Sequence, residues 1–330
     1  MKRLAIIGGG AWGTALASVA TRAGIQTMLW ARDPAVVGAI NEQNQNPLFL
    51  PGISLDPSIA ATTDMATAIA AADAALLVVP AQFLRGILTR LAAQLPAAMP
   101  LLLCAKGIET ESLRTMSELA GEIVPKSPVA VLSGPSFAAE VARGLPTAVT
   151  IASRDADLAR SFMAALGTDR FRPYLSRDPI GAEIGGAVKN VMAIACGVVE
   201  GRGLGDNARA ALITRGLAEM VRLGEAMGAQ AETFRGLSGL GDLVLTCTAR
   251  QSRNHALGLA LGRGDSLESA LAARQPSVVE GVATAAAVAR LASRLGIEMP
   301  ITSAVDGMLH RGIAIDAAIE ALLNRPWRSE

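Results

Sequence analysis

The sequence has few of the residues that form disulfides and metal sites. Its 330 residues include two histidines and three cysteines, and Cys104, Cys196 and Cys247 lie far apart in apolar segments. This spacing excludes a disulfide framework and a Cys-x-x-Cys zinc site. Neither histidine has a cluster of carboxylates near it in the chain. We therefore expect buried thiols, a reducing cytoplasmic location and no bound metal.

An excess of one charge and long apolar runs are missing as well. The 30 basic and 29 acidic residues give a net charge of +1 and form no basic block, which argues against a nucleic-acid partner. Apolar residues make up 51% of the chain, but no uninterrupted apolar run approaches the ~20 residues that cross a bilayer. We therefore expect a soluble protein without a membrane span.

Lysine is also scarce, with four residues against 26 arginines. Lys106 follows the apolar run 101–105, and Lys189 lies in the glycine-rich apolar segment 185–192. A charge in such a place is costly unless it has a partner. Lysine differs from arginine because its pKa falls readily on burial, which suits it to proton transfer. The pair is predicted to meet at a reaction centre, although each lysine alone also fits a side chain that reaches solvent from the end of its element.

The chain is longer than one hydrophobic core usually fills, so we expect two domains. Short apolar runs alternate with helical patterns at 4–7, 27–30, 74–79, 101–104, 129–132 and 148–152, with a last strand at 171–174. This alternation predicts a parallel sheet covered on both faces. Asp178 and Pro179 then form a helix start, and the pattern is helical from there onward. The predicted α/β fold is a Rossmann-like, doubly wound, mostly parallel sheet over 1–177, followed by an all-helical domain over 178–330.

A dinucleotide-binding fingerprint directly follows the first predicted strand and opens a helix. In this Gly-x-Gly-x-x-Gly pattern Gly8 permits a tight turn, Gly10 lets the backbone approach a pyrophosphate, and Gly13 allows close helix packing. The amides and dipole of the helix N-terminus favour the anion. The second strand ends before Arg32, where an NAD-restricted site usually has a carboxylate. Arg32 suits the 2′-phosphate of NADPH, or it is a solvated charge with Asp33 capping the next helix.

Three further segments resemble ligand sites. A strand, a turn and a helix start bring Gly134 and Ser136 together, which suits an anion or a cofactor but also fits a capped turn. Asp242 follows flexible glycines and is either a helix cap or the partner that neutralises and aims Lys189. The run Ser252-Arg253-Asn254 offers a forked cation and two neutral hydrogen-bonding groups, which suits a phosphate; alone it also fits a solvated helix face.

Taken together, these segments resemble the bacterial NAD(P)-dependent sn-glycerol-3-phosphate dehydrogenases over nearly the full chain. The order, spacing and joint occurrence of the matching stretches are highly specific. They are GGGAWGTALA (8–17), LWARDP (29–34), CAKGIE (104–109), LSGPSFAAEVARGLPTAV (132–149), GGAVKNVMAIACG (185–197), GLGDLVLTCTARQSRN (239–254) and VVEG (278–281).

The resemblance implies roles for individual residues. Lys189 would accept a proton from glycerol 3-phosphate or donate one to dihydroxyacetone phosphate, with Lys106 and Asp242 contacting the same substrate. The substrate, chiefly its phosphate, would be held by Gly134, Ser136, Ser252, Arg253 and Asn254. The positions that match cofactor contacts are Trp12, Arg32, Lys106, Ala138, Arg253, Val278 and Glu280.

The resemblance also implies a homodimer that supplies the backbone precursor for phospholipid synthesis. Ala11 stands where many relatives carry serine, so a hydroxyl near the pyrophosphate is missing while the backbone amides remain. Two other readings stay open at this stage. One is a lysine-dependent dehydrogenase of a β-hydroxyacid such as 6-phosphogluconate, for which the combination of Lys106, the residues at 252–254 and the Gly-Leu-Gly-Asp segment is not expected. The other is a non-catalytic NAD(P)-binding sensor, which has no need of Lys189 or Asp242.

Overall fold

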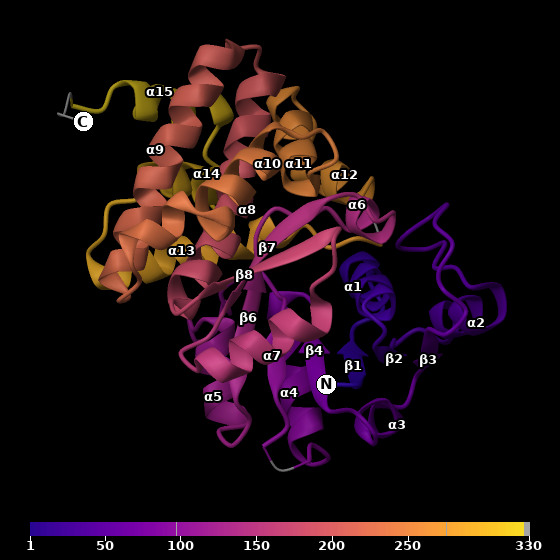
Figure 1. Ribbon diagram of the computed structural model, residues 1–330. Coiled ribbons are helices and arrows are strands. Elements are labelled where there is room, and N and C mark those ends of the chain that lie inside the picture. The colour runs from indigo at the N-terminus through magenta and orange to yellow at the C-terminus, as the bar shows by residue number, and fades with distance from the viewer. Residues whose placement is uncertain (97, 275, 327–330) are drawn as a thin grey trace.

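The chain folds into a sheet covered by helices, with a body of further helices packed against it (Figure 1). The computed structural model describes residues 1–96, 98–274 and 276–326, so the predicted end of the second domain, 327–330, lies outside the described residues. Within them, the sheet has the order β3-β2-β1-β4-β5-β6-β7-β8. Its strands are β1 (Arg3–Ile7), β2 (Gln26–Trp30), β3 (Ala60–Thr62), β4 (Ala74–Leu77), β5 (Leu101–Leu103), β6 (Val129–Ser133), β7 (Thr147–Ala152) and β8 (Phe171–Ser176).

Helices cover both faces of the sheet, because Leu4 to Ile7 of β1 are all buried while successive side chains of a strand point to opposite faces. Leu4 and Ile6 face the layer of α1, α2 and α7, and Ala5 and Ile7 face the layer of α3, α4 and α5. The predicted doubly wound sheet is therefore confirmed. The helices of this part are α1 (Ala11–Arg22), α2 (Pro34–Gln43), α3 (Met65–Ile69), η1 (Ala81–Phe83), α4 (Leu84–Ala92), α5 (Met116–Ile123), α6 (Ala138–Ala142) and α7 (Ala156–Leu166).

The sheet is mostly parallel, with β6 and β7 as its antiparallel pair. Each predicted strand is present. Strand β3 was not predicted from the sequence, because its three residues carry two alanines and form no apolar run. It pairs with β2 from Met28 to Trp30, so its place in the sheet comes from the neighbouring strand and not from its own sequence.

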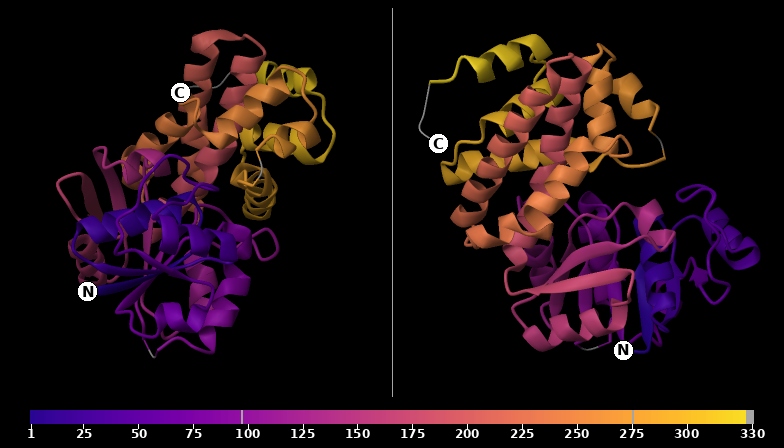
Figure 2. Two further views of the ribbon diagram at one scale, coloured as in Figure 1. Left: turned by 90° about the vertical axis from the view of Figure 1, so that its right-hand side faces the viewer. Right: turned by 45° about the horizontal axis from the view of Figure 1, so that its top comes forward.

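The second half is helical throughout the part that the structure describes, as predicted. The long helix α8 lies at its centre, and Asp178 caps it by accepting a hydrogen bond from Gly181 N at 2.9 Å. The helices are α8 (Pro179–Gly201), α9 (Gly205–Ala226), η2 (Ala231–Arg235), η3 (Leu237–Gly241), α10 (Asp242–Thr248), α11 (Arg253–Gly262), α12 (Leu267–Ala272), α13 (Glu280–Leu295), α14 (Pro300–His310) and α15 (Ile315–Leu323). Both views of Figure 2 show them on one side of the sheet.

Helix α8 is long and apolar enough to cross a membrane by length and composition, but its most apolar window is completely buried inside the protein. It packs on α9, α10, α11 and α13 and touches β6. We therefore read α8 as the core helix of the second half. Because it runs from the sheet into the helical body, residues along one helix can contact both parts (Figure 1).

Candidate active site

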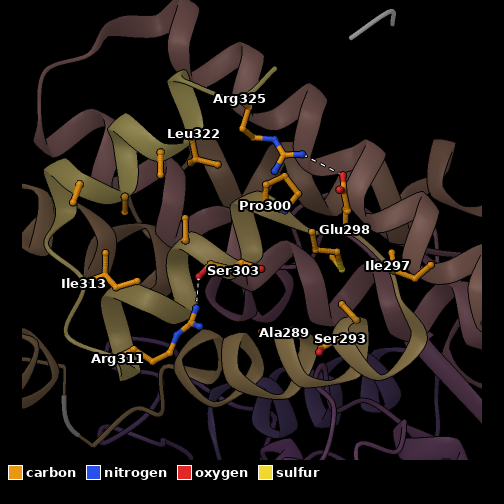
Figure 3. A pocket seen from close by; sticks show the side chains of 16 residues that line it. Ala289, Ser293, Ile297, Glu298, Pro300, Ser303, Arg311, Ile313, Leu322 and Arg325 are labelled. Atoms are coloured by element: carbon orange, nitrogen blue, oxygen red, sulfur yellow. Dashed lines mark hydrogen bonds and ion pairs between the residues drawn. The ribbon is translucent and has the colours of Figure 1, made fainter. Parts of the chain in front are cut away.

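A cavity of about 490 Å³ lies between α13, α14 and α15 (Figure 3), and none of the predicted site residues lines it. Its wall is mostly alanine and other apolar side chains. Its two arginines already have partners: Arg325 pairs with Glu298 at 3.2 Å, and Arg311 donates to the carbonyl of Ser303 at 2.9 Å. The residues predicted to bind cofactor or substrate lie instead where the helical body meets the carboxyl ends of the strands.

The glycine-rich loop joins β1 to α1 in the conformation that a dinucleotide site needs. Gly8 has φ +134°, a backbone conformation that residues with a side chain rarely adopt. A Cβ on Gly13 would lie 1.8 Å from the carbonyl oxygen of Gly8. A Cβ on Gly10 would meet open space. Gly10 is the N-cap of α1 and makes no side-chain capping bond, so the first amides of the helix remain available to an anion.

Residues beside this loop also fit a dinucleotide. The indole Nε1 of Trp12 is buried and has no hydrogen-bond partner among the described residues, and a buried donor of this kind calls for an acceptor. Asp33 caps α2 by accepting from Ala35 N at 2.9 Å, as predicted for one of its possible roles. Arg32 is exposed. Its guanidinium makes no hydrogen bond or ion pair with the residues that the structure describes. The loop therefore fits NADH, and the free guanidinium fits the extra phosphate of NADPH.

The structure brings Lys106, Lys189 and Asp242 together, although they come from three separate elements. Lys106 follows β5, Lys189 lies on α8, and Asp242 is the first residue of α10. One carboxylate oxygen of Asp242 lies 2.6 Å from Lys189 Nζ and the other lies 2.8 Å from Lys106 Nζ. The carboxylate therefore bridges the two lysines and does not cap its helix, which was the alternative reading of its position.

Burial sets the electrostatics of this cluster. Asp242 is completely buried, and Lys189 is only 7% exposed. Burial lowers the pKa of Lys189 to about 8; the charge of Asp242 opposes this shift and that of Lys106 adds to it. Burial alone would raise the pKa of Asp242, but the two lysines outweigh that effect and lower it. The result is an ionised carboxylate beside an amine that can exchange a proton near neutral pH.

Sequence analysis did not single out Thr246 and Asn190, which also belong to the cluster. The Thr246 hydroxyl lies 3.1 Å from Lys189 Nζ and donates to the carbonyl of Asp242 at 2.6 Å. The amide of Asn190 reaches the backbone carbonyl of Lys106 at 3.4 Å. Both had a signal in the sequence, because Thr246 is one helical turn after Asp242 and Asn190 is next to Lys189.

The segment predicted to hold phosphate begins α11. Ser252 is its N-cap and accepts from His255 N at 3.3 Å. Asn254 donates to Asn190 Oδ1 at 2.9 Å and accepts from Gly281 N at 3.0 Å, so part of its hydrogen-bonding capacity is used inside the protein. The Arg253 side chain is exposed, and no hydrogen bond ties it to the described part of the chain. Arg253 is therefore the member of the segment with its full set of donors available.

Glu280 faces the same region from the start of α13. Its carboxylate accepts a hydrogen bond from Ala81 N at 3.3 Å, which joins the helical body to the first residue of η1. Burial raises the pKa of Glu280, while the nearby positive charge of Arg253 opposes the shift. Val278, two residues earlier, is 42% exposed. Of these two predicted cofactor positions, Glu280 therefore lies near Arg253.

The turn after β6 completes the group. The carbonyl of Gly134 accepts a hydrogen bond from Lys106 Nζ at 2.8 Å and another from the Ser136 hydroxyl at 2.9 Å. Ala138 begins the short helix α6 two residues later. Arg32, by contrast, lies at the end of β2 and makes no contact with the lysine cluster, as expected for a residue that would meet the far end of an extended cofactor. No group of residues suited to a metal ion occurs within the described segments.

A doubly wound sheet, a dinucleotide loop and a lysine-carboxylate cluster at the strand ends define an NAD(P)-dependent dehydrogenase. Comparison of the chain with known protein families identifies which group of dehydrogenases it belongs to. Residues 3–159 match the description "NAD-dependent glycerol-3-phosphate dehydrogenase N-terminus", and residues 178–320 match the corresponding C-terminus. The chain therefore belongs to the NAD-dependent glycerol-3-phosphate dehydrogenase family.

Individual relatives agree over the whole chain. The glycerol-3-phosphate dehydrogenase [NAD(P)+] of Rhodospirillum rubrum is 59% identical over 99% of this chain and 93% of its own length. That of Parvibaculum lavamentivorans is 56% identical over 100% of this chain and 98% of its own length. The crystal structure of glycerol-3-phosphate dehydrogenase from Coxiella burnetii superposes with a TM-score of 0.95 at 40% identity, covering 98% and 99% of the two chains. These matches favour the predicted family over the β-hydroxyacid dehydrogenases and over a sensor.

Proposed function

We propose that this protein interconverts sn-glycerol 3-phosphate and dihydroxyacetone phosphate with NAD(P)H or its oxidised form. The observation that carries the proposal is the pairing of Lys189 and Lys106 on the buried carboxylate of Asp242. This cluster lies at the same edge of the sheet as the dinucleotide loop. Membership of the family and the names of the relatives support the same substrate pair.

Lys189 is the proposed proton donor and acceptor. The bound nicotinamide supplies a hydride to the substrate carbonyl or takes one from the alcohol carbon. With a pKa of about 8, Lys189 is present in both protonation states near neutral pH, so it can donate to the carbonyl oxygen in reduction and accept from the hydroxyl in oxidation. Lys106 would orient the same oxygen, and Asp242 would hold both ammonium groups in place.

The phosphate of the substrate is assigned to the start of α11. Arg253 offers a planar fork of donors that matches two phosphate oxygens. Ser252 and Asn254 flank it, and each keeps a donor that its protein contacts leave unused. Gly134 and Ser136 would contact the substrate from the β6 turn, next to Lys106.

The cofactor is assigned to the loop at 8–13 and to groups on both sides of it. The pyrophosphate would lie on the amides that follow Gly10, with Ala11 contributing only its backbone, and the orphaned indole N–H of Trp12 would find its acceptor there. Arg32 would bind the 2′-phosphate of NADPH. The nicotinamide end would meet Lys106 and the residues Ala138, Arg253, Val278 and Glu280.

The proposal includes how the protein is organised and where it works. We divide the chain into an NAD(P)-binding domain at 1–177 and a helical substrate-binding domain at 178–330, because the last strand ends at Ser176 and α8 begins at Pro179. We further propose a cytoplasmic homodimer that supplies glycerol 3-phosphate to phospholipid synthesis. Three free, buried cysteines are consistent with a reducing compartment.

The test follows the oxidation of NADPH and NADH in the presence of dihydroxyacetone phosphate. Wild type should be active with both cofactors, and 6-phosphogluconate with the oxidised cofactors should give no comparable rate. Lys189→Ala should bind cofactor but lose roughly 10² to 10⁴ in kcat. Lys126→Ala is the matched control, because Lys126 is an exposed lysine remote from the cluster. No turnover of dihydroxyacetone phosphate by wild type would refute the proposal. A near wild-type kcat for Lys189→Ala would refute the role of Lys189 as proton donor and acceptor.

A further inference from the structure

Asn46 is a buried side chain that contacts the dinucleotide loop from outside the fingerprint. It lies in the connection between α2 and β3 and is 0% exposed. Its Nδ2 donates to the carbonyl oxygen of Gly9 at 2.9 Å and to the hydroxyl of Thr14 at 2.8 Å. Its Oδ1 accepts from Phe49 N at 3.3 Å. Both N–H groups of one amide are therefore used to hold the start of α1.

The contact with Gly9 has a geometric consequence for the neighbouring residue. The carbonyl of Gly9 and the N–H of Gly10 belong to one peptide unit, which is planar and trans, so they point in opposite directions. Holding the carbonyl towards Asn46 therefore aims the Gly10 N–H away from Asn46. Because the loop consists of glycines, the peptide has few other restraints on its orientation.

The surroundings of Gly9 leave this role to Asn46. A Cβ on Gly9 would lie 2.5 Å from the Cβ of Ala31, so no side chain at this position can hold the loop. Ala11 carries no hydroxyl, and Gly10 makes no side-chain capping bond. The bond to Thr14 joins the same amide to the first turn of α1, so Asn46 connects the loop and the helix whose amides face an anion.

We propose that Asn46 is a positioning residue for the pyrophosphate of the cofactor: it fixes the Gly9–Gly10 peptide so that the loop amides point towards the phosphates. The inference rests on the proposed function, because it assumes that the loop binds NAD(P)(H). It concerns a residue that touches the loop and not the cofactor. Its loss should therefore weaken the binding of ligands with a phosphate at this loop and leave other parts of the cofactor site intact.

The experiment compares two ligands and three variants. NADPH places a pyrophosphate on the loop, whereas adenosine 2′-monophosphate presents the adenine and the 2′-phosphate without one. Asn46→Leu and Asn46→Ala both remove the two donors, the first with a side chain of similar size and the second without added bulk or charge. Asn41→Leu is the matched control. The Asn41 amide also bonds the backbone, because it donates to Ala61 O at 2.9 Å and accepts from Ala61 N at 2.8 Å, but it does not touch the loop.

Dissociation constants are measured for both ligands after the melting temperature of each variant has been recorded. We expect the Kd for NADPH to rise about tenfold in both Asn46 variants, because a buried carbonyl loses its donor and the loop amides lose their orientation. The Kd for adenosine 2′-monophosphate should stay within twofold of wild type. Asn41→Leu should lower the melting temperature without changing either Kd. The kcat at saturating NADPH should change less than the KM.

Two results would overturn the inference: NADPH binding within twofold of wild type in the Asn46 variants, or equal weakening of both ligands, which would indicate a general loss of structure. Asn46→Ala adds neither bulk nor charge and keeps the test available if Asn46→Leu does not fold. Failure of the proposed function is distinguishable, because it would appear in wild type itself, as an absence of dihydroxyacetone phosphate turnover or of NADPH and NADH binding. If wild type binds and the variants bind equally well, only the role of Asn46 is refuted.

Discussion

Replacing Asp242 with asparagine tests how the site controls the protonation of Lys189. An amide of the same size keeps the packing but removes the charge that lies 2.6 Å from Lys189 Nζ and 2.8 Å from Lys106 Nζ. Burial and the neighbouring Lys106 both lower the pKa of Lys189, and Asp242 is the carboxylate that opposes them. In the variant these two effects act without opposition, so the pKa of Lys189 must fall below its wild-type value of about 8.

The size of the effect follows from the distance. A neighbouring opposite charge shifts the pKa of a group by about 1 to 3 units, and one pKa unit corresponds to about 1.36 kcal/mol. The protein should also lose stability, because removing one partner from a buried ion pair costs about 3 to 5 kcal/mol. Deprotonation of Lys189 relieves part of this cost, so the loss of stability should be smaller at high pH than at pH 6.

The assay is the pH dependence of kcat for dihydroxyacetone phosphate reduction at saturating NADPH. Reduction needs protonated Lys189, so the wild-type rate should fall as pH rises through about 8. In Asp242→Asn the fall should begin about 1 to 3 pH units lower. Oxidation of glycerol 3-phosphate needs the neutral amine, so its rising limb should move in the same direction.

Asp178→Asn provides the control for this experiment. Asp178 is also a buried aspartate, but its carboxylate accepts from Gly181 N and Gln230 N, each at 2.9 Å, and touches no lysine. This variant should lose stability, while the pH at which its kcat falls should stay near that of wild type. If kcat of Asp242→Asn falls at the same pH as that of wild type, the reasoning is refuted, because the carboxylate would then not control the pKa of Lys189.

Three further predictions concern phosphate, cofactor and stability. Arg253→Lys replaces a fork with a point charge, so the KM for dihydroxyacetone phosphate should rise clearly; an unchanged KM would place the phosphate elsewhere. Arg32→Ala should weaken NADPH more than tenfold and NADH less, because a charged hydrogen bond contributes about 1.5 to 3 kcal/mol; equal losses in the two KM values would contradict a 2′-phosphate contact. Glu183 is buried and accepts from Ser117 N at 2.7 Å, and burial raises its pKa from 4.5 to about 7. The folded state therefore binds more protons than the unfolded state between these pH values, so unfolding free energy should fall by about 3 kcal/mol as pH rises from 4 to 8. Urea unfolding should show that Glu183→Gln removes this pH dependence, and an unchanged slope would show that another group causes it.

Local patterns in the sequence identified most of the fold. The strands at 4–7, 27–30 and 101–104 were predictable because continuous apolar runs bounded by turn residues describe a parallel strand buried on both faces. Asp178 before Pro179 predicted the start of α8 because a cap needs only neighbouring residues. Strand β3 was missed because its pairing with β2 and not its own composition makes it a strand.

The residues of the candidate site and the meeting of Lys106 with Lys189 were predicted from the sequence, but the atoms through which they contact Asp242 were not. The scarcity of lysine drew attention to Lys106 and Lys189, the pattern at 252–254 indicated a phosphate site, and the resemblance to a family supplied a role for Glu280. Thr246 and Asn190 were missed because threonine and asparagine are common on helices, and their importance depends on which atoms lie next to them. Asn46 was missed for the same reason, since it reaches the glycine loop from 37 residues away along the chain.

The sequence by itself therefore determined the class of fold, the dinucleotide loop and the candidates for the reactive side chains, because these depend on short-range periodicity, on glycine at fixed spacing and on residue type. Only the tertiary structure decided that Asp242 bridges lysines 53 and 136 residues away from it. It also decided that Lys189 has a pKa near 8. The physical reason is that a pKa depends on burial and on the distances between charges, and both arise when segments far apart in the chain pack together.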